Sequence, residues 1–215
     1  MNFDFAAIIQ TWRRVLTQPG EEVFVQEKLD ANGTLTTAVI WMVIAGVVAA
    51  IFGLIQGVIG VGAMSGALAD AGLPPEMEQA LAPMMGSMLG GAGVAAIITV
   101  PVFFLIGALI YHLLATVLGG SGDFGKFAYL FATFQAPLTI VSAVLAVIPF
   151  LGACIALLLS VYSYVLSYFA VKANYGLAQG RALAVILIPL GLGLLVAVCA
   201  FIAIFSFGMA VMSAN

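Results

Sequence analysis

The chain has 215 residues, of which 64% are hydrophobic and only 7% are charged. A soluble domain carries about 25% charged residues, so this composition excludes a soluble globular protein and indicates an all-α protein embedded in a membrane. The net charge of −3, with only six Lys and Arg residues, also excludes a nucleic-acid-binding surface, which requires a field of positive charge.

Residues 1–34 are predicted to form a cytoplasmic amphipathic segment. Its apolar side chains recur at helical spacing, namely Phe5, Ile8, Ile9, Trp12, Val15 and Leu16. Such a helix lies in the lipid headgroup layer, packs under the cytoplasmic face of the helix bundle, or does both. In the first arrangement Trp12 lies at the boundary and Arg13 and Arg14 face anionic lipid. These three residues are therefore candidates for binding lipid or a partner protein.

Five long uncharged runs follow, and each is long enough to cross the hydrocarbon core, which takes about 20 residues. The predicted spans are about 35–62, 93–118, 127–148, 152–171 and 182–205. Residues 35–215 are therefore expected to form one five-helix transmembrane domain. The range 63–92 is expected to be an outer loop, in which Met84, Met85 and Met88 favour an apolar face over a site for a soft metal ion.

The basic residues predict the orientation of the bundle. With five crossings, all six fall on one side of the membrane, namely Arg13, Arg14, Lys28, Lys126, Lys172 and Arg181. Loops on the cytoplasmic side of a membrane are enriched in Lys and Arg, so the N-terminus is expected in the cytoplasm and the C-terminus outside. The Gly/Ala-rich composition and compact loops favour a bacterial inner (plasma) membrane.

Catalytic chemistry has little support in the sequence. His112 is the only histidine, and no span contains a carboxylate with which it would form a proton relay. The chain also lacks the spacing of metal ligands and the lysine-containing loop that binds phosphate. We therefore expect no enzyme activity, no metal and no cofactor.

Five polar residues are candidates for a pocket that opens to the cytoplasm: Tyr111, His112, Gln135, Tyr164 and Tyr168. All six tyrosines fall in or near the cytoplasmic half of the bundle. The alternative is an ordinary belt of aromatic residues at headgroup depth, although such belts usually occur on both sides of a membrane. His112 has a further alternative, an interhelical hydrogen bond.

Three segments carry motifs of a known family. They begin at Thr11, Leu118 and Ser163, and their matching residues are Trp12, Val15, Leu16, Pro19, Phe24, Gly119, Gly120, Phe124, Pro137, Tyr164, Gly176, Ala184 and Pro189. In this order they resemble bacterial members of the Ypt/Rab-interacting membrane protein (YIP) family. The resemblance covers about residues 11–189 and implies a five-helix fold with a short tail outside. It also implies kinship with eukaryotic proteins that act in vesicle trafficking.

These observations favour a non-enzymatic integral membrane protein that organises membrane partners or lipids. The expected partners are the lipid bilayer and membrane or cytoplasmic proteins, and a second copy of the chain is a further candidate. The alternative is a small-molecule transporter or channel that acts as an oligomer, with its pathway lined by the five polar residues above.

Overall fold

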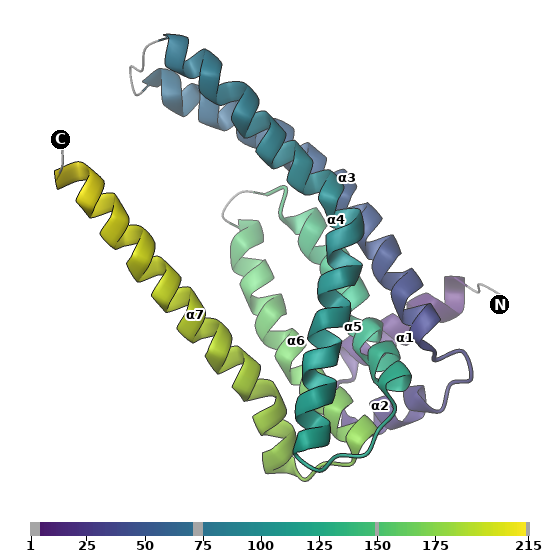
Figure 1. Ribbon diagram of the computed structural model, residues 1–215. Helices are drawn as coiled ribbons and strands as arrows, with labels where there is room; N and C mark the ends of the chain where they lie inside the picture. The colour runs from purple at the N-terminus through teal and green to yellow at the C-terminus, as the bar shows by residue number, and fades with distance from the viewer. Residues whose placement is uncertain (1–4, 71–74, 149–150, 214–215) are drawn as a thin grey trace.

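The computed structural model describes residues 5–70, 75–148 and 151–213, and their side chains apart from those of 61, 63–90, 92, 204 and 207–213. All regular elements in these ranges are helices (Figure 1). They are α1 (Phe5–Thr17), α2 (Glu21–Lys28), α3 (Leu35–Asp70), α4 (Pro75–Val117), α5 (Phe124–Leu145), α6 (Leu151–Tyr175) and α7 (Gln179–Ser213). The prediction of an all-α protein is confirmed.

Five of these helices are long and apolar enough to cross a membrane. The candidate spans are Leu35–Gly60, Gly93–Val117, Phe124–Leu145, Leu151–Tyr175 and Gln179–Ala203. The prediction of an integral membrane protein with five spanning helices is therefore confirmed. The backbone is helical over most of the expected outer loop, residues 63–92, because α3 continues to Asp70 and α4 begins at Pro75. The side chains of its methionines lie outside the described residues.

Helix α5 is the centre of the bundle. More than half of its span is buried, against a third or less of each other span. Asp123 caps its N-terminus, because a side-chain oxygen accepts a hydrogen bond from the Lys126 amide at 2.8 Å. Phe127, Phe131 and Phe134 then form a chain of aromatic contacts along the helix. Helices α3, α4 and α6 surround α5 within the bundle, and α1 and α2 also contact it.

Glycine allows α3 and α4 to approach each other backbone to backbone. A Cβ atom added to Gly53 would lie 2.9 Å from the Gly93 Cα, and one added to Gly46 would lie 2.8 Å from the Ala96 carbonyl oxygen. Backbone atoms cannot move aside as a flexible side chain can. Close packing through small residues is a common way for membrane helices to associate, since apolar burial alone does not drive them together in lipid.

The C-terminal ends of α4 and α6 meet at one end of the bundle. Each helix is followed by a glycine in the left-handed region, Gly119 with φ 86° and Gly176 with φ 62°, which reverses the chain. The Ser121 amide then donates a hydrogen bond to the Tyr175 carbonyl at 3.2 Å. The glycine-rich turn after α4 is thereby joined to the end of α6.

Among the described side chains of helix α7, those that pack on the bundle lie near its beginning. Ala182, Val185 and Ile186 are buried, whereas every described side chain from Gly191 onward is exposed. Pro189 lies between these two parts. Figure 1 shows α7, in yellow-green, diverging from α6 along its length. Most of α7 therefore presents an apolar surface to its surroundings.

The α3–α4 approach makes a first prediction. We expect Gly53→Leu to destabilise the protein by about 1–3 kcal/mol, because the new side chain meets backbone atoms of α4. Thermal unfolding in detergent measures the change. Gly191→Leu is the matched control, since nothing lies within 4 Å of that position, and it is expected to leave stability nearly unchanged. Equal effects of the two substitutions would contradict the prediction.

Candidate functional site

The Lys and Arg residues gather at the end of the bundle where α4 and α6 finish, which we term the basic end. Helices α1 and α2 lie across this end (Figure 1). Three of the cations donate hydrogen bonds to backbone carbonyl oxygens, and two of these carbonyls lie where α6 and α4 finish. Lys28 Nζ lies 2.9 Å from the Asn174 carbonyl, Arg181 Nη1 lies 3.1 Å from the Leu118 carbonyl and Lys126 Nζ lies 2.7 Å from the Asp30 carbonyl.

Two further cations form ion pairs at the basic end. Arg14 Nη1 lies 2.9 Å from Glu27 Oε1, and Lys172 Nζ lies 2.6 Å from Glu21 Oε2. Glu27 is buried, with 4% of its side chain exposed, whereas Arg14 is 46% exposed. Burial raises the pKa of the Glu27 carboxyl, and the charge of Arg14 opposes that rise. The two pairs fasten α2 to α1 and to α6.

The three candidate residues of α1 have different surroundings. Trp12 packs edge-on against Trp41 of α3, with ring centroids 5.7 Å apart, and Arg14 is held by Glu27. Arg13 is exposed, and its guanidinium has no partner among the described residues. Helix α1 thus packs on the bundle, the second of the two arrangements considered from the sequence. Of the three side chains, Arg13 alone remains free for an external ligand.

Docking of α1 also depends on contacts near its C-terminus. Val15 is fully buried, and the Tyr162 hydroxyl of α6 donates a hydrogen bond to the Leu16 carbonyl at 2.7 Å. Phe5 and Ile9, at the other end of the same helix, remain 68% and 47% exposed. The amphipathic stripe is therefore divided between the bundle and the surroundings.

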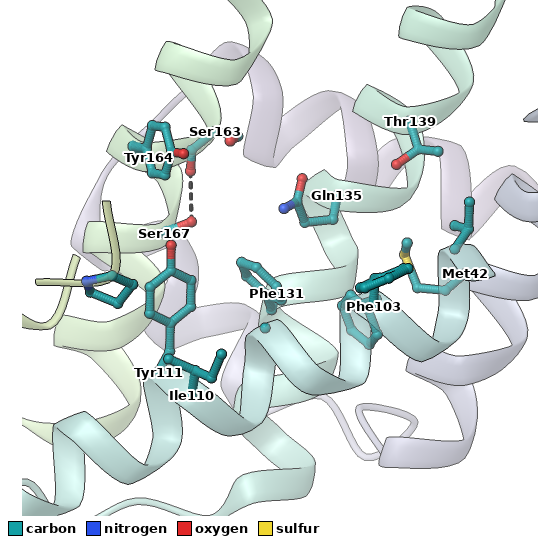
Figure 2. Close-up of a pocket in the computed structure, with 14 residues that line it drawn as sticks. Met42, Phe103, Ile110, Tyr111, Phe131, Gln135, Thr139, Ser163, Tyr164 and Ser167 are labelled. Carbon is teal, nitrogen blue, oxygen red and sulfur yellow. Dashed lines mark hydrogen bonds between the residues drawn. The ribbon is translucent and has the colours of Figure 1, made fainter. Parts of the chain in front are cut away.

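A cavity of about 420 Å³ lies among α4, α5 and α6, with one lining residue each from α3 and α7 (Figure 2). Three of the five pocket candidates line it, namely Tyr111, Gln135 and Tyr164. Its other lining residues are Met42, Val100, Phe103, Phe104, Gly107, Ile110, Phe131, Thr139, Ser163, Ser167 and Pro189. These residues were not assigned from the sequence. On α4 they recur at helical spacing from Tyr111, which is the signal that identifies the lining face.

His112 and Tyr168 do not line this cavity. His112 Nδ1 forms a hydrogen bond of 2.6 Å with the Tyr175 hydroxyl, and its ring also packs against Phe124. Tyr168 packs against Phe169, its neighbour on α6. The His112 contact is the interhelical hydrogen bond considered as an alternative from the sequence, and it joins α4 to α6 beside the basic end.

The sequence was compared with protein families, curated proteins and solved structures. The model of the Yip1 domain matches residues 13–211. The chain belongs to the Yip1 family. No match was found among curated proteins or among solved structures. The resemblance of the three sequence motifs to the YIP family as a whole is thus confirmed, and the matched range of this Yip1 chain includes all five candidate spans.

The Arg14–Glu27 pair makes a second prediction. We expect Arg14→Gln to weaken the docking of α1 and α2 by about 1–3 kcal/mol, because it leaves a buried carboxylate without its counter-charge. Hydrogen exchange of residues 5–28 in nanodiscs measures the docking. Arg14→Gln combined with Glu27→Gln is the control, and it is expected to restore most of the protection.

The effect of Arg14→Gln is also expected to depend on pH. The pKa of Glu27 is already raised in the folded state, so the folded state binds its proton more tightly, and stability falls as pH rises through that pKa. Removing Arg14 raises the pKa further. Lowering the pH is therefore expected to reduce the difference in hydrogen-exchange protection between the variant and the native protein. A difference in protection that is constant with pH would show that the charge of Glu27 is not its cause.

The His112–Tyr175 hydrogen bond makes a third prediction. In a double-mutant cycle of His112→Phe and Tyr175→Phe, we expect a coupling of about 0.5–1.5 kcal/mol in the free energy of unfolding, measured in mixed detergent micelles. A parallel cycle of His112→Phe and Tyr168→Phe is expected to be additive, since Tyr168 makes its ring contact elsewhere. Additivity in the first cycle would show that this bond contributes nothing to stability.

Proposed function

We propose that this Yip1-family protein is a non-catalytic organiser of the membrane surface, which binds anionic lipid, and protein partners beside it, at its basic end. The observation that carries this proposal is the unpartnered face of α1. Phe5, Ile9 and Arg13 are all exposed and lie at i, i+4 and i+8, so they share one side of a helix that is otherwise fixed to the bundle.

This face has the chemistry of an interfacial anchor. Exposed apolar side chains enter the boundary between headgroups and acyl chains, while an arginine beside them meets lipid phosphate. The other five cations are already engaged by carbonyls or carboxylates within the described residues. A single basic residue near an anionic surface contributes about 1 kcal/mol. The selectivity for anionic lipid is accordingly modest and centred on Arg13.

The proposal includes an orientation and a location. The basic end faces the cytoplasm, because basic residues are enriched on that side of a membrane, and the membrane is a bacterial inner (plasma) membrane. In this orientation α1 and α2 lie at the cytoplasmic surface, where they meet both the inner leaflet and cytoplasmic proteins.

The cavity supports a second candidate function, transport of a small molecule by an oligomer of this chain. A space of about 420 Å³ lined by tyrosine hydroxyls and an amide falls within the range of small-ligand sites, about 300–1,000 Å³. The exposed apolar surface of α7 is available for a second copy of the chain. Substrate flux into liposomes distinguishes this candidate from the organiser.

The proposed lipid site makes a fourth prediction. We expect Arg13→Gln to lower the retention of phosphatidylglycerol about fivefold, which corresponds to the loss of about 1 kcal/mol. Native mass spectrometry of protein released from nanodiscs of phosphatidylcholine and phosphatidylglycerol measures the retained lipid. Arg13→Lys, which keeps the charge, is the control and is expected to retain the lipid. If Arg13→Gln retains phosphatidylglycerol as the native protein does, the proposed lipid site is wrong.

A further inference from the structure

The cavity among α4, α5 and α6 contains polar groups without protein partners. Tyr111 is only 8% exposed, yet its hydroxyl forms no hydrogen bond with another described residue. The same holds for the Gln135 amide and the Tyr164 hydroxyl. Figure 2 shows the Gln135 amide and the Tyr111 side chain extending toward the same space. Ser167 differs, because its hydroxyl donates to the Ser163 carbonyl at 2.7 Å.

These groups lie at the depth of lipid acyl chains. Tyr111 is six residues before Val117, where α4 ends, and therefore about 9 Å from the basic end. Gln135 is eleven residues after Phe124, where α5 begins, and therefore about 16 Å from it. A hydrocarbon core is about 30 Å thick and provides no water to satisfy polar groups. A ligand with oxygen atoms is the natural partner for such donors.

The lining determines the chemistry of that ligand. None of the lining residues that the structure describes is charged, so a charged headgroup held there would have no counter-charge among them. Tyrosine hydroxyls and the Gln135 amide donate to uncharged carbonyl or hydroxyl oxygens. The remaining wall is apolar, and on α4 it continues from Tyr111 through Phe104 to Val100, away from the basic end. The site thus has a polar part and an apolar part that follows the direction of acyl chains.

We propose that this cavity binds the uncharged head of a neutral lipid such as diacylglycerol. Tyr111 and Gln135 donate to its hydroxyl or ester oxygens, and an acyl chain lies along Phe104 and Val100. This inference is independent of the proposed lipid-binding face on α1. That face binds anionic lipid at the membrane surface, whereas the cavity binds an uncharged lipid within the membrane.

The test uses the full chain in phosphatidylcholine nanodiscs that contain labelled diacylglycerol or phosphatidic acid with the same acyl chains. We expect the protein to retain diacylglycerol in preference to phosphatidic acid. Tyr111→Phe and Gln135→Leu are each expected to lower retention about threefold to tenfold, the effect of one lost hydrogen bond. Gly107→Leu is expected to lower it further by filling the cavity, since a Cβ atom there is in ordinary contact with Phe131.

Two controls make the result decisive. Tyr168→Phe removes a hydroxyl of the same helix as Tyr164 but outside the cavity, and it is expected to retain diacylglycerol fully. Arg13→Gln is expected to retain it as well, which separates this site from the proposed surface site. Tyr111→Phe removes a single oxygen atom and is expected to fold. It therefore tests the proposed diacylglycerol site even if Gln135→Leu fails to fold. Equal retention of the two lipids, or full retention by Tyr111→Phe, would overturn the proposal.

Discussion

The open carbonyl oxygens at the ends of α4 and α6 are the constraint on which the basic end depends. Each helix that finishes at the edge of a membrane leaves carbonyls without intrahelical partners. Lys28 of α2 reaches the end of α6, and Arg181 of α7 reaches the end of α4. Each cation therefore comes from a different helix from the one whose end it holds. The same hydrogen bonds that satisfy these termini also hold α2 and α7 in place.

The basic residues thus have a structural role in addition to their role in the orientation of the chain in the membrane. Enrichment of Lys and Arg on one side predicts which way the chain is inserted. In the structure, five of the six are engaged by carbonyls or carboxylates of the described residues, and Arg13 is left exposed. A count of charges on the sequence gives Arg13 and Arg14 equal weight. The buried Glu27 distinguishes them, because it engages Arg14 alone.

The number and type of the spanning helices could be predicted from the sequence, but the faces that they turn inward could not. Hydropathy identifies a span because its whole surface is apolar, and a helix that is apolar all round carries no pattern that shows its buried side. Tyr111 and His112 are adjacent, yet one lines the cavity and the other bonds to Tyr175. The rotation of each helix about its own axis depends on packing, such as that of the α3 glycines against α4 and of the aromatic rings along α5.

The sparse packing of α7 has a consequence for how the protein is made. Chains enter the membrane from the N-terminus as they are synthesised, and earlier parts fold first. The central helix α5 contacts α1, α2, α3, α4 and α6, all of which precede α7 in the chain. Among the described side chains of α7, only Ala182, Val185 and Ile186 are buried. Assembly of the core can therefore be nearly complete before the last span leaves the ribosome, and α7 joins a bundle that already exists.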